Sequence, residues 1–473
     1  MLRPDQIADL AILMNNPRHM LLSEPGTGKT PTICVYQRWL REQHGTPSVW
    51  TMPKSLLEKN RDEAIQFGGW APEDVVIVDG TQRDVEAQLA KPAGVFLMGF
   101  RRFEMEWQKF PREWKAFQAD EFHKGFGGHD SLQAQAMYGF MQRQGEWFVP
   151  MTGTLLDGKL ETAFPAINVI EPRYYGSFES FCHYHRMIDL FTGKKTGYRN
   201  HDNLQTVLRK HGIRRLFSDI FGPQDPVMQV EWLSMSEAQR EIYDRFQNEA
   251  ILELEKFYID GTQPGVAFMR ACQIMDHPNR FPDLVDEGQF VDIMPGHRTA
   301  KAERLDLHLT DHVETGRPLI IYAPWVPQQH EAFELARQAG LRVGLITGAT
   351  SSTERGQIDR GFRAGELNCL ICSPLVADAG FNWQFCGLQE VPHIIFLSLP
   401  YKDTTLQQAI RRAIRQARAT ALRVTILAYK QSLNIRQMQL IEQKSIEANR
   451  VDPTYKVFAL LPRDEHRGTS SSL

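Results

Sequence analysis

The octapeptide Ser23–Thr30, SEPGTGKT, constrains the fold and chemistry of this chain more than any other segment. The apolar run at 20–22 predicts a short buried strand before it, and the apolar residues at 33–35 fall on one side of a helix after it. A strand, a glycine-rich loop and a helix in this order form a cradle in which backbone N–H groups and the helix N-terminus face an anion. The octapeptide therefore predicts a loop that binds nucleotide phosphates.

The residues of this loop have separate predicted roles. Gly26 and Gly28 allow the positive φ angles and the close backbone approach that a side chain would block. Thr27 lies between them and contributes to the cradle. Lys29 reaches the terminal phosphates of the nucleotide, and the Thr30 hydroxyl can hold Mg²⁺.

A pair of acidic residues, Asp120 and Glu121, is the next chemical landmark. Downstream of a phosphate loop, one such carboxylate holds the Mg²⁺ that bridges the phosphates, and the other orients or deprotonates the attacking water. An exposed acidic pair at a helix start, favoured by the helix dipole, gives the same pattern. The preceding residues 117–119 are less apolar than those of a central strand usually are.

Length and composition indicate a globular protein of several units. The chain has 473 residues, of which 42% are hydrophobic and 23% charged, and this length predicts two to four structural units. With a net charge of −3, a nucleic-acid partner must meet a local basic surface. No apolar run has the length of a membrane span, and a signal-peptide core is absent, so we expect no membrane contact.

The cysteines are scattered along the chain, and only Cys369 and Cys372 have a spacing typical of metal ligands. No second pair completes a zinc site, so reduced core thiols in a cytoplasmic protein are expected.

Strand-like runs separated by helical stretches predict two parallel sheets. In the first part of the chain these runs are 49–53, 75–78, 95–98 and 147–151. Helical periodicity dominates from about 160 to 297. In the last part the runs are 319–322, 343–346, 369–372, 393–397 and 424–427, followed by a helix at about 433–449.

A cluster of arginines lies in the last part of the chain. Residues 408–415 predict a helix that presents arginines at 411, 412, 415 and 418, and Arg412 and Arg415 are three apart and so share a face. A solvated basic helix face would give this pattern. An arginine finger that closes on the γ-phosphate of a nucleotide would give it too.

In their order, these landmarks resemble those of superfamily-two helicases, and within them of the SWI/SNF-type DNA translocases. The resemblance covers residues 2 to 430. Its main motifs are matched in turn by Leu2–Gln6, Ser23–Thr30, Asp120–His123, Thr152–Thr154, Ser373–Asn382 and Gln408–Arg415. The subgroup is indicated by Arg214-Arg215, by 233–243, by 269–273 with His277-Pro278, and by Gly348 with Arg355 and Phe362.

This resemblance implies an α/β fold with two RecA-like parallel-sheet lobes, a helical insertion between them and a C-terminal helix. The expected domains are lobe 1 at 1–160, the insertion and linker at 161–297, lobe 2 at 298–430 and the C-terminal helix with a polar tail at 431–473. A few positions depart from the pattern of the family. These are Ser23, Ala379 and Arg411 in place of glycine, Arg418 in place of glutamine, and Lys124 directly after the D-E-x-H box without the usual lysine further on.

The resemblance also implies ATP and Mg²⁺ as cofactors and assigns roles to residues. Gln6 would read adenine, Asp120 would hold Mg²⁺, Glu121 would act on the attacking water, and Arg412 and Arg415 would enter the cleft. The fifth motif adds Asp378 and Gly380 to the nucleotide site. Coupling of ATP to movement is implied for His123, Thr152, Thr154 and Gln408. Contacts with the DNA backbone are implied for Lys54, Arg101 and Arg102.

We therefore expect an ATP-dependent translocase or helicase-like motor acting on double-stranded or forked DNA, in replication, recombination or repair. DNA would be bound through its backbone without regard to sequence, and the helical insertion could recruit a protein partner. The alternatives are an RNA-directed helicase of the same superfamily, and a nucleotide switch or motor subunit that needs a partner complex. Trp383, directly after the fifth motif, is expected to be a core residue and not a base-stacking wedge.

Overall fold

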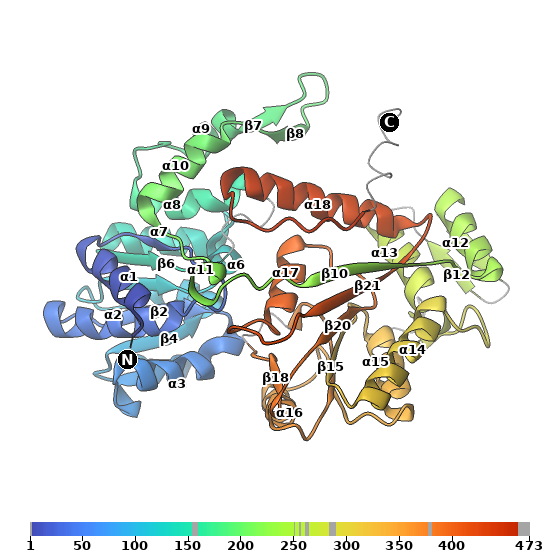
Figure 1. Cartoon of the computed structure of the whole chain (residues 1–473). Helices are drawn as coiled ribbons and strands as arrows, with labels where there is room; N and C mark the ends of the chain where they lie inside the picture. The colour runs from blue at the N-terminus through green and yellow to red at the C-terminus, as the bar shows by residue number, and fades with distance from the viewer. Residues whose placement is uncertain are drawn as a thin grey trace. The chain divides into compact units, whose positions relative to one another are not determined.

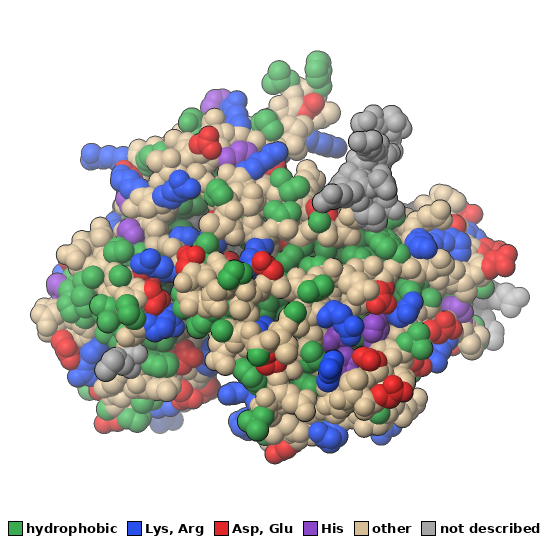
Figure 2. Space-filling view, in the orientation of Figure 1, with side chains coloured by type: hydrophobic (Ala, Val, Ile, Leu, Met, Phe, Trp, Pro, Cys, Tyr) green, Lys and Arg blue, Asp and Glu red, His purple; other side chains and the backbone are tan. Residues whose placement is uncertain are grey.

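The computed structural model describes residues 2–153, 159–249, 251–254, 257–260, 264–282, 290–376 and 381–461. The chain divides into two compact units (Figure 1). The first comprises residues up to Pro223 together with Ile446–Lys456, and the second comprises Gln224–Ser445 with the residues from Val457 onward. On the face drawn in Figure 2, basic and acidic side chains are interspersed over both units, in keeping with the small net charge of −3.

The first unit is built on a five-stranded parallel sheet. Its strand order is β3-β4-β2-β5-β6, and every neighbouring pair is parallel. The strands are β2 (Ser48–Met52), β3 (Val75–Ile77), β4 (Val95–Gly99), β5 (Ala116–Ala119) and β6 (Trp147–Pro150). The strand runs predicted for this part of the chain are therefore confirmed.

A second, shorter ladder lies beside this sheet and leads into the glycine-rich loop. It consists of β1 (Met20–Leu21) paired in parallel with β9 (Gly212–Ile213). Leu21 also forms an isolated parallel bridge with Met151, directly after β6. Two segments far along the first unit, β9 and the residue after β6, therefore hold the strand that precedes the glycine-rich loop.

Helices cover both faces of the first sheet because its strand residues alternate between two buried clusters. One cluster joins Val49 and Phe117 to side chains of α5 (Phe100–Glu106), α6 (Phe122–Phe126) and α7 (Leu132–Arg143). The other joins Trp50 and Leu97 to α1 (Pro4–Asn15), α2 (Lys29–His44) and α3 (Leu57–Gly68). This is the doubly wound arrangement that alternating strands and helices predict.

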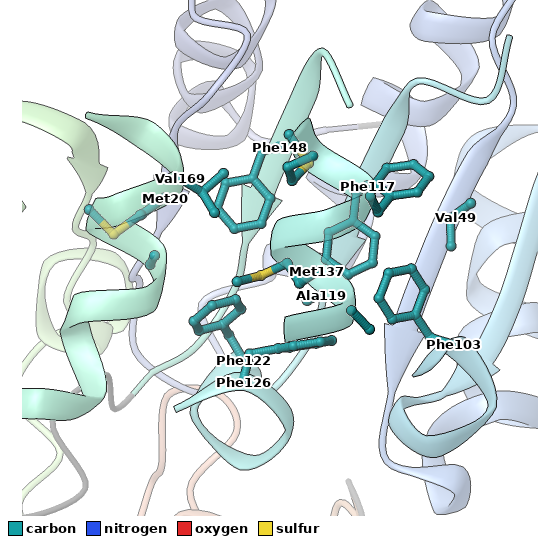
Figure 3. Packing of buried hydrophobic residues seen from close by; sticks show 14 of the residues in the cluster. Met20, Val49, Phe103, Phe117, Ala119, Phe122, Phe126, Met137, Phe148 and Val169 are labelled. Carbon is teal, nitrogen blue, oxygen red and sulfur yellow. The ribbon is translucent and has the colours of Figure 1, made fainter. Parts of the chain in front are cut away.

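Phenylalanine dominates the first of these clusters (Figure 3). Phe117 and Phe148, from adjacent strands, lie parallel with ring centroids 6.1 Å apart, and Phe103 packs on Phe117 at 4.7 Å. Gln118, the residue that weakens the apolar character of this segment, is fully buried. The segment before Asp120 is therefore a central strand, so the expected interpretation of the acidic pair as a strand end is correct.

The first unit continues well beyond its sheet. It contains α4 (Gln82–Leu89), η4 (Leu160–Ala163), α8 (Phe164–Ile170), α9 (Phe178–His185), the hairpin β7 (Arg186–Ile188) and β8 (Lys195–Tyr198), α10 (His201–His211) and α11 (Phe217–Phe221). Leu160, Phe181 and Leu204 belong to the same buried cluster as the sheet. All of these elements except α4 come from residue 160 onward, in the part of the chain predicted to be a helical insertion, and packing joins them to the sheet of the first unit.

The second unit holds a six-stranded parallel sheet with the order β10-β21-β20-β15-β17-β16. Its strands are β10 (Val227–Leu233), β15 (Leu319–Tyr322), β16 (Val343–Ile346), β17 (Cys369–Cys372), β20 (His393–Phe396) and β21 (Arg423–Tyr429). Five of these were predicted and are confirmed. The two parallel sheets confirm the expected fold class.

The sixth strand, β10, is a correction, because it lies in the range predicted to be helical insertion. It pairs along all seven residues with β21, at the edge of the sheet. Gln229 and Glu231 interrupt its apolar pattern, and most of its residues are partly exposed. An edge strand needs only one buried face, so it carries no continuous apolar run that sequence reasoning could find.

The remaining elements of the second unit are mostly helices. They are α12 (Glu237–Glu249), α13 (Pro264–Asp276), α14 (Ala300–Thr315), α15 (Val326–Gln338), α16 (Ser352–Ala364) and α17 (Asp403–Arg411), with the short pairs β11 (Ile251–Leu254) and β12 (Phe257–Asp260), β13 (Phe281–Pro282) and β14 (Phe290–Val291), and β18 (Phe385–Cys386) and β19 (Gln389–Glu390). The predicted C-terminal helix is α18 (Leu433–Val451), and its last residues belong to the first unit.

The cysteines are all free thiols, and Cys369 and Cys372 are buried in β17. Because they are three residues apart on a strand, their side chains lie on opposite faces of the sheet. Among the described residues, no helix combines the length and the apolar character that a membrane crossing requires.

A buried histidine cluster joins the second sheet to α14. His393 is 1% exposed, and its ring nitrogens contact Nε2 of His312 at 3.0 Å and Oγ1 of Thr425 at 2.8 Å. Burial, with the nearby Arg423 guanidinium and His312, lowers the pKa of His393 to about 2. His393 is therefore neutral in the folded protein, whereas it takes up a proton near pH 6.5 when unfolded.

This difference predicts a loss of stability in mild acid. A group whose folded pKa is depressed in this way binds more protons in the unfolded state, so the free energy of unfolding decreases as pH falls below about 6.5. We expect urea unfolding at pH 7 and pH 5 to show this decrease. His393→Gln should lower the overall stability but reduce the proton uptake on unfolding at pH 5 by close to one. An unchanged pH slope in that variant would contradict the assignment.

Candidate nucleotide site

The glycine-rich loop joins β1 to α2 and has the backbone that its sequence predicts. Gly26 and Gly28 have φ angles of 85° and 88°. A Cβ atom on Gly28 would lie 2.5 Å from Nε2 of Gln6 and would displace that side chain, and the positive φ itself favours glycine at this position. The loop therefore combines left-handed backbone with close packing, as a phosphate cradle requires.

The charge and the amide groups of the loop suit an anion. Nζ of Lys29 donates to the carbonyls of Ser23 at 2.6 Å and Glu24 at 3.2 Å, which holds the ammonium over the loop. The Thr27 hydroxyl donates to the Glu24 carbonyl at 2.7 Å. The N-cap residue of α2 is Gly28, which has no side chain to cap the helix, and the first amides of α2 point toward the loop.

Gln6 lies against this loop from the start of α1. Its Nε2 donates to the Gly28 carbonyl at 3.0 Å, and its Oε1 accepts from the Arg3 amide at 2.8 Å. The guanidinium of Arg3 also donates to the Thr27 carbonyl. Gln6 is thus positioned at the phosphate loop, and its contact with adenine stays a prediction.

The acidic pair follows β5 directly and has an unusual backbone. Glu121 adopts a φ of 48°, a left-handed conformation that costs free energy in a residue with a side chain. Its amide donates to Oδ1 of Asp120 at 2.9 Å. Burial, reinforced by the neighbouring Glu121 carboxylate, raises the pKa of Asp120 to about 6, with Lys29 opposing the rise. Two carboxylates held this close, one of them poorly solvated, suit a divalent cation.

His123 connects the acidic pair to the next motif. Its Nδ1 lies 2.8 Å from Oγ1 of Thr152 and 3.7 Å from Oε2 of Glu121. Gly153 packs so closely on the loop that a Cβ there would lie 2.6 Å from Cδ of Pro25. Three of the predicted motifs thus meet at the carboxyl edge of the first sheet. Thr154, the remaining residue of this group, lies outside the described residues.

Sequence reasoning assigned no site role to Arg214 and Arg215, which support the loop from β9. Arg215 bonds Oδ1 of Asp9 on α1 with Nε at 2.8 Å and Nη2 at 2.6 Å, and its amide donates to Oγ of Ser23 at 3.1 Å. Arg214 donates to the carbonyl of Leu22 and pairs with Asp452 at 2.7 Å. The Ser23 hydroxyl therefore accepts a hydrogen bond from the Arg215 amide, at a position where the family pattern of the phosphate loop has glycine.

We predict that Arg215→Ala loosens the loop. The Asp9 carboxylate is 4% exposed, so removing the guanidinium leaves it buried without that partner and costs about 1–3 kcal/mol of stability. Thermal unfolding and titration with ATP should show lower stability and weaker binding. Lys115→Ala, which breaks an exposed pair with Glu146, is the control and should cost at most about 1 kcal/mol. Equal effects of the two changes would contradict this role.

The arginines of the second unit need a correction. The predicted helix at 408–415 ends at Arg411, and Arg412 to Ile414 continue as a tight turn with bonds to carbonyls three residues back. Arg412 and Arg415 nevertheless converge, because both donate to the Phe381 carbonyl, at 3.4 Å and 2.9 Å. The turn, and not a helix face, brings these two side chains together.

The structure describes three further residues that were singled out near these arginines. Arg418, which replaces a glutamine of the family pattern, donates to the carbonyls of Ala413 at 2.6 Å and Val391 at 2.7 Å and so stabilises the turn. Gln408 is buried on α17. Trp383 is fully buried and donates to Asp359 at 2.9 Å, which confirms it as a core residue. Asp378 and Gly380 lie outside the described residues.

The predicted DNA-contacting residues lie after the carboxyl ends of β2 and β4. Nζ of Lys54 contacts Oδ1 of Asp79 at 3.0 Å and is largely exposed. Arg102 donates to the Gly80 carbonyl at 2.8 Å and to Glu106 at 3.4 Å, with little of its side chain exposed. Arg101 is exposed and pairs with Glu104. Lys54 and Arg101 are therefore accessible to a partner, whereas the Arg102 guanidinium is used largely within the protein.

These residues fit ATP and Mg²⁺. Lys29, the amides of the loop and the start of α2 would hold the phosphates, and Thr30 with Asp120 would hold the cation, which supplies charge stabilisation for phosphoryl transfer. Within the described part of the chain, no group of three or more His, Cys, Asp or Glu side chains could bind a metal by protein ligands alone.

Two parallel α/β units, with a phosphate loop and an acidic pair at one edge of the first sheet, define the class of two-lobed P-loop nucleotide-binding proteins. The family profile of the SNF2-related domain matches residues 8–280, and that of the helicase conserved C-terminal domain matches residues 300–417. The chain therefore belongs to the SNF2-related family, and the predicted resemblance to SWI/SNF-type proteins is confirmed.

Relatives are distant and much longer. The CHD3-type chromatin-remodeling factor CHR7 of Arabidopsis thaliana is 23% identical over 90% of this chain and 35% of its own length. The transcription regulatory protein SNF2 of Saccharomyces cerevisiae is 23% identical over 94% of this chain and 26% of its own length. The chain thus spans only about a quarter to a third of these relatives. The solved Sulfolobus solfataricus SWI2/SNF2 ATPase core in complex with dsDNA is 15% identical, with a TM-score of 0.42 and coverage of 97% and 98% of the two chains.

Proposed function

We propose that this protein is a DNA-dependent ATPase that uses ATP and Mg²⁺ to move along duplex or forked DNA. The observation that carries the proposal is the convergence of Lys29, Asp120, Glu121 and His123–Thr152 at one sheet edge in a chain of the SNF2-related family. The names of the relatives describe chromatin remodelling and transcription. We further propose that the protein acts on DNA in replication, recombination or repair.

In this proposal each side chain has a defined task. Lys29 and the loop amides bind the terminal phosphates, and Thr30 and Asp120 hold Mg²⁺. Glu121, fixed by its left-handed backbone, orients the attacking water and accepts its proton. Arg412 and Arg415 neutralise the charge that develops on the γ-phosphate when the lobes close.

Motion would be transmitted through the contacts between motifs. The hydrogen bond between His123 and Thr152 links the acidic pair to the segment after β6, so a change at the γ-phosphate can move that segment. Thr154 and Gln408 would extend this coupling, and Asp378 and Gly380 would complete the nucleotide site. Backbone contacts through Lys54 and Arg101 would make DNA binding independent of sequence.

The proposal is tested by steady-state ATP hydrolysis with no polymer, single-stranded DNA, duplex DNA, forked DNA and RNA. We expect duplex or forked DNA to stimulate hydrolysis strongly. Glu121→Gln should abolish this hydrolysis while ATP still binds. Stimulation by RNA alone would favour an RNA-directed helicase. A rate unmoved by every polymer would favour a nucleotide switch or a motor subunit that needs its partner complex.

The arginine assignment has its own test. Arg415→Ala should leave ATP binding intact and reduce the DNA-stimulated rate by about 10³–10⁵, the range measured for arginine fingers. Binding is measured by equilibrium titration and turnover by phosphate release. Arg418→Ala is the control, because its guanidinium bonds carbonyls of the turn and should affect stability more than catalysis. Near-normal turnover by Arg415→Ala would contradict the role.

The DNA contact is tested with a matched pair of lysines. Lys54 pairs with Asp79 at 3.0 Å and Lys115 pairs with Glu146 at 3.2 Å, and they lie near opposite ends of the parallel strands. Lys54→Ala should weaken binding to all DNA sequences alike and reduce the slope of log K against log salt by about one. Lys115→Ala should leave both unchanged. Equal behaviour of the two variants would contradict a role for Lys54.

A further inference from the structure

The hairpin β7–β8 of the first unit has no role in the proposed ATP site. It follows α9 and extends beyond that helix, with its connecting loop at the far end (Figure 1). The two strands are antiparallel, with Arg186 opposite Tyr198 at the base and an irregularity after Met187. In Figure 2 hydrophobic side chains gather at the end of this projection.

The loop of the hairpin presents two large apolar side chains to solvent. Leu190 is 95% exposed and Phe191 is 100% exposed, while Met187 and Ile188 on β7 are 42% and 47% exposed. A single exposed apolar residue is ordinary, but adjacent leucine and phenylalanine at the end of a projection are unfavourable in water. Contact with a partner would remove this cost.

The loop is ordered by its own hydrogen bonds. Oδ1 of Asp189 accepts from the amides of Phe191 at 3.0 Å and Thr192 at 2.7 Å and from the Thr192 hydroxyl at 2.9 Å. These bonds hold the pKa of Asp189 below its usual value. The Gly193 amide donates to the Asp189 carbonyl at 2.9 Å, and Gly193 has a φ of 66°. Phe191 is therefore held outward by a defined turn.

The base of the hairpin is anchored to the body of the first unit by Glu161 on η4. Its carboxylate accepts from Nε of Arg186 at 2.6 Å and from the Tyr198 hydroxyl. Burial raises the pKa of Glu161, but these hydrogen bonds outweigh it and lower the pKa overall. η4 packs against α6, the helix that begins directly after Glu121. The hairpin is thus connected through packed elements to the acidic pair.

The charge of the hairpin identifies the chemistry of its partner. Residues 186–199 contain the four basic residues Arg186, Lys194, Lys195 and Arg199 and one acidic residue, Asp189. Glu161 pairs with Arg186 at 2.6 Å and with Lys195 at 3.8 Å, so the hairpin and its anchor together still carry four basic against two acidic side chains, with Lys194 exposed near the tip. A basic segment with an exposed aromatic side chain at its tip is complementary to phosphates that flank a base face. Apolar side chains such as phenylalanine and leucine also insert at base steps.

We infer that the β7–β8 hairpin is a nucleic-acid contact in which Phe191 stacks on an unpaired base where a DNA duplex opens into single strands. Lys194, at the exposed end, lies where it can meet the neighbouring phosphates. This inference rests on the proposed DNA-directed function and adds the part of the DNA that the hairpin recognises. Leu190 would cover the edge of the stacked base.

The test measures binding of the full chain to three fluorescent DNAs: a blunt duplex, a fork with unpaired arms, and the same fork with 2-aminopurine at the first unpaired position. Phe191→Ala should weaken fork binding by roughly 5- to 150-fold, the range expected for one lost base stack. Binding of the blunt duplex should not change, and the quenching of 2-aminopurine should be lost. Phe191→Trp should restore both properties.

Leu388→Ala is the matched control, because Leu388 is also 100% exposed and lies in the short turn between β18 and β19 of the second unit. This variant should bind the fork as the wild type does. Fork binding by Phe191→Ala equal to the wild type would overturn the inference, and would leave a protein partner as the occupant of the tip.

The same experiment separates the inference from the proposed function. ATP hydrolysis of each variant is measured with the blunt duplex, which presents no unpaired base. Stimulation in the wild type together with unchanged fork binding by Phe191→Ala would overturn the inference alone. Absent stimulation would overturn the proposed function, while the binding assay would still decide on the hairpin. A wild-type chain that binds none of the DNAs would overturn both.

Discussion

The structure depends on parallel strand pairing, because it brings the carboxyl ends of all strands of a sheet to one edge. At that edge of the first unit lie the phosphate loop after β1, the acidic pair after β5 and Thr152 after β6. These segments are distant in sequence, and each alone is a weak indication of function. Their meeting at one edge converts three short motifs into a site with an ammonium, two carboxylates and uncapped helix amides.

The phosphate loop is held by residues that arrive from far along the chain. β9 pairs with β1, and Arg215 joins Asp9 on α1 to the backbone beside Ser23. Arg214 contacts both Leu22 and Asp452, so the segment after α18 contributes to the same support. The helix α18 begins in the second unit, and its last residues belong to the first.

Strained or poorly solvated groups are concentrated where the proposed chemistry takes place. Glu121 has a left-handed backbone, and Asp120 has a raised pKa because it is buried beside a second carboxylate. Both features cost stability in the protein alone, and a bound cation would stabilise the charged form of Asp120. The tip of the β7–β8 hairpin, which follows α9, is a second unfavourable feature, because the Phe191 side chain is 100% exposed to water.

Most strands, the loop glycines and the family can be predicted from the amino-acid sequence, because buried parallel strands carry continuous apolar runs and a phosphate loop tolerates few side chains. The sequence did not reveal the edge strand β10, because polar residues break its apolar pattern. It also did not reveal that α17 ends at Arg411. A turn follows there, in which Arg412, Arg415 and Arg418 all bond nearby carbonyls. Two facts became visible only in the folded protein: Arg214 and Arg215 support the phosphate loop, and Phe191 is exposed at the tip of an anchored hairpin. Both facts depend on contacts between residues far apart in sequence, which no local pattern contains.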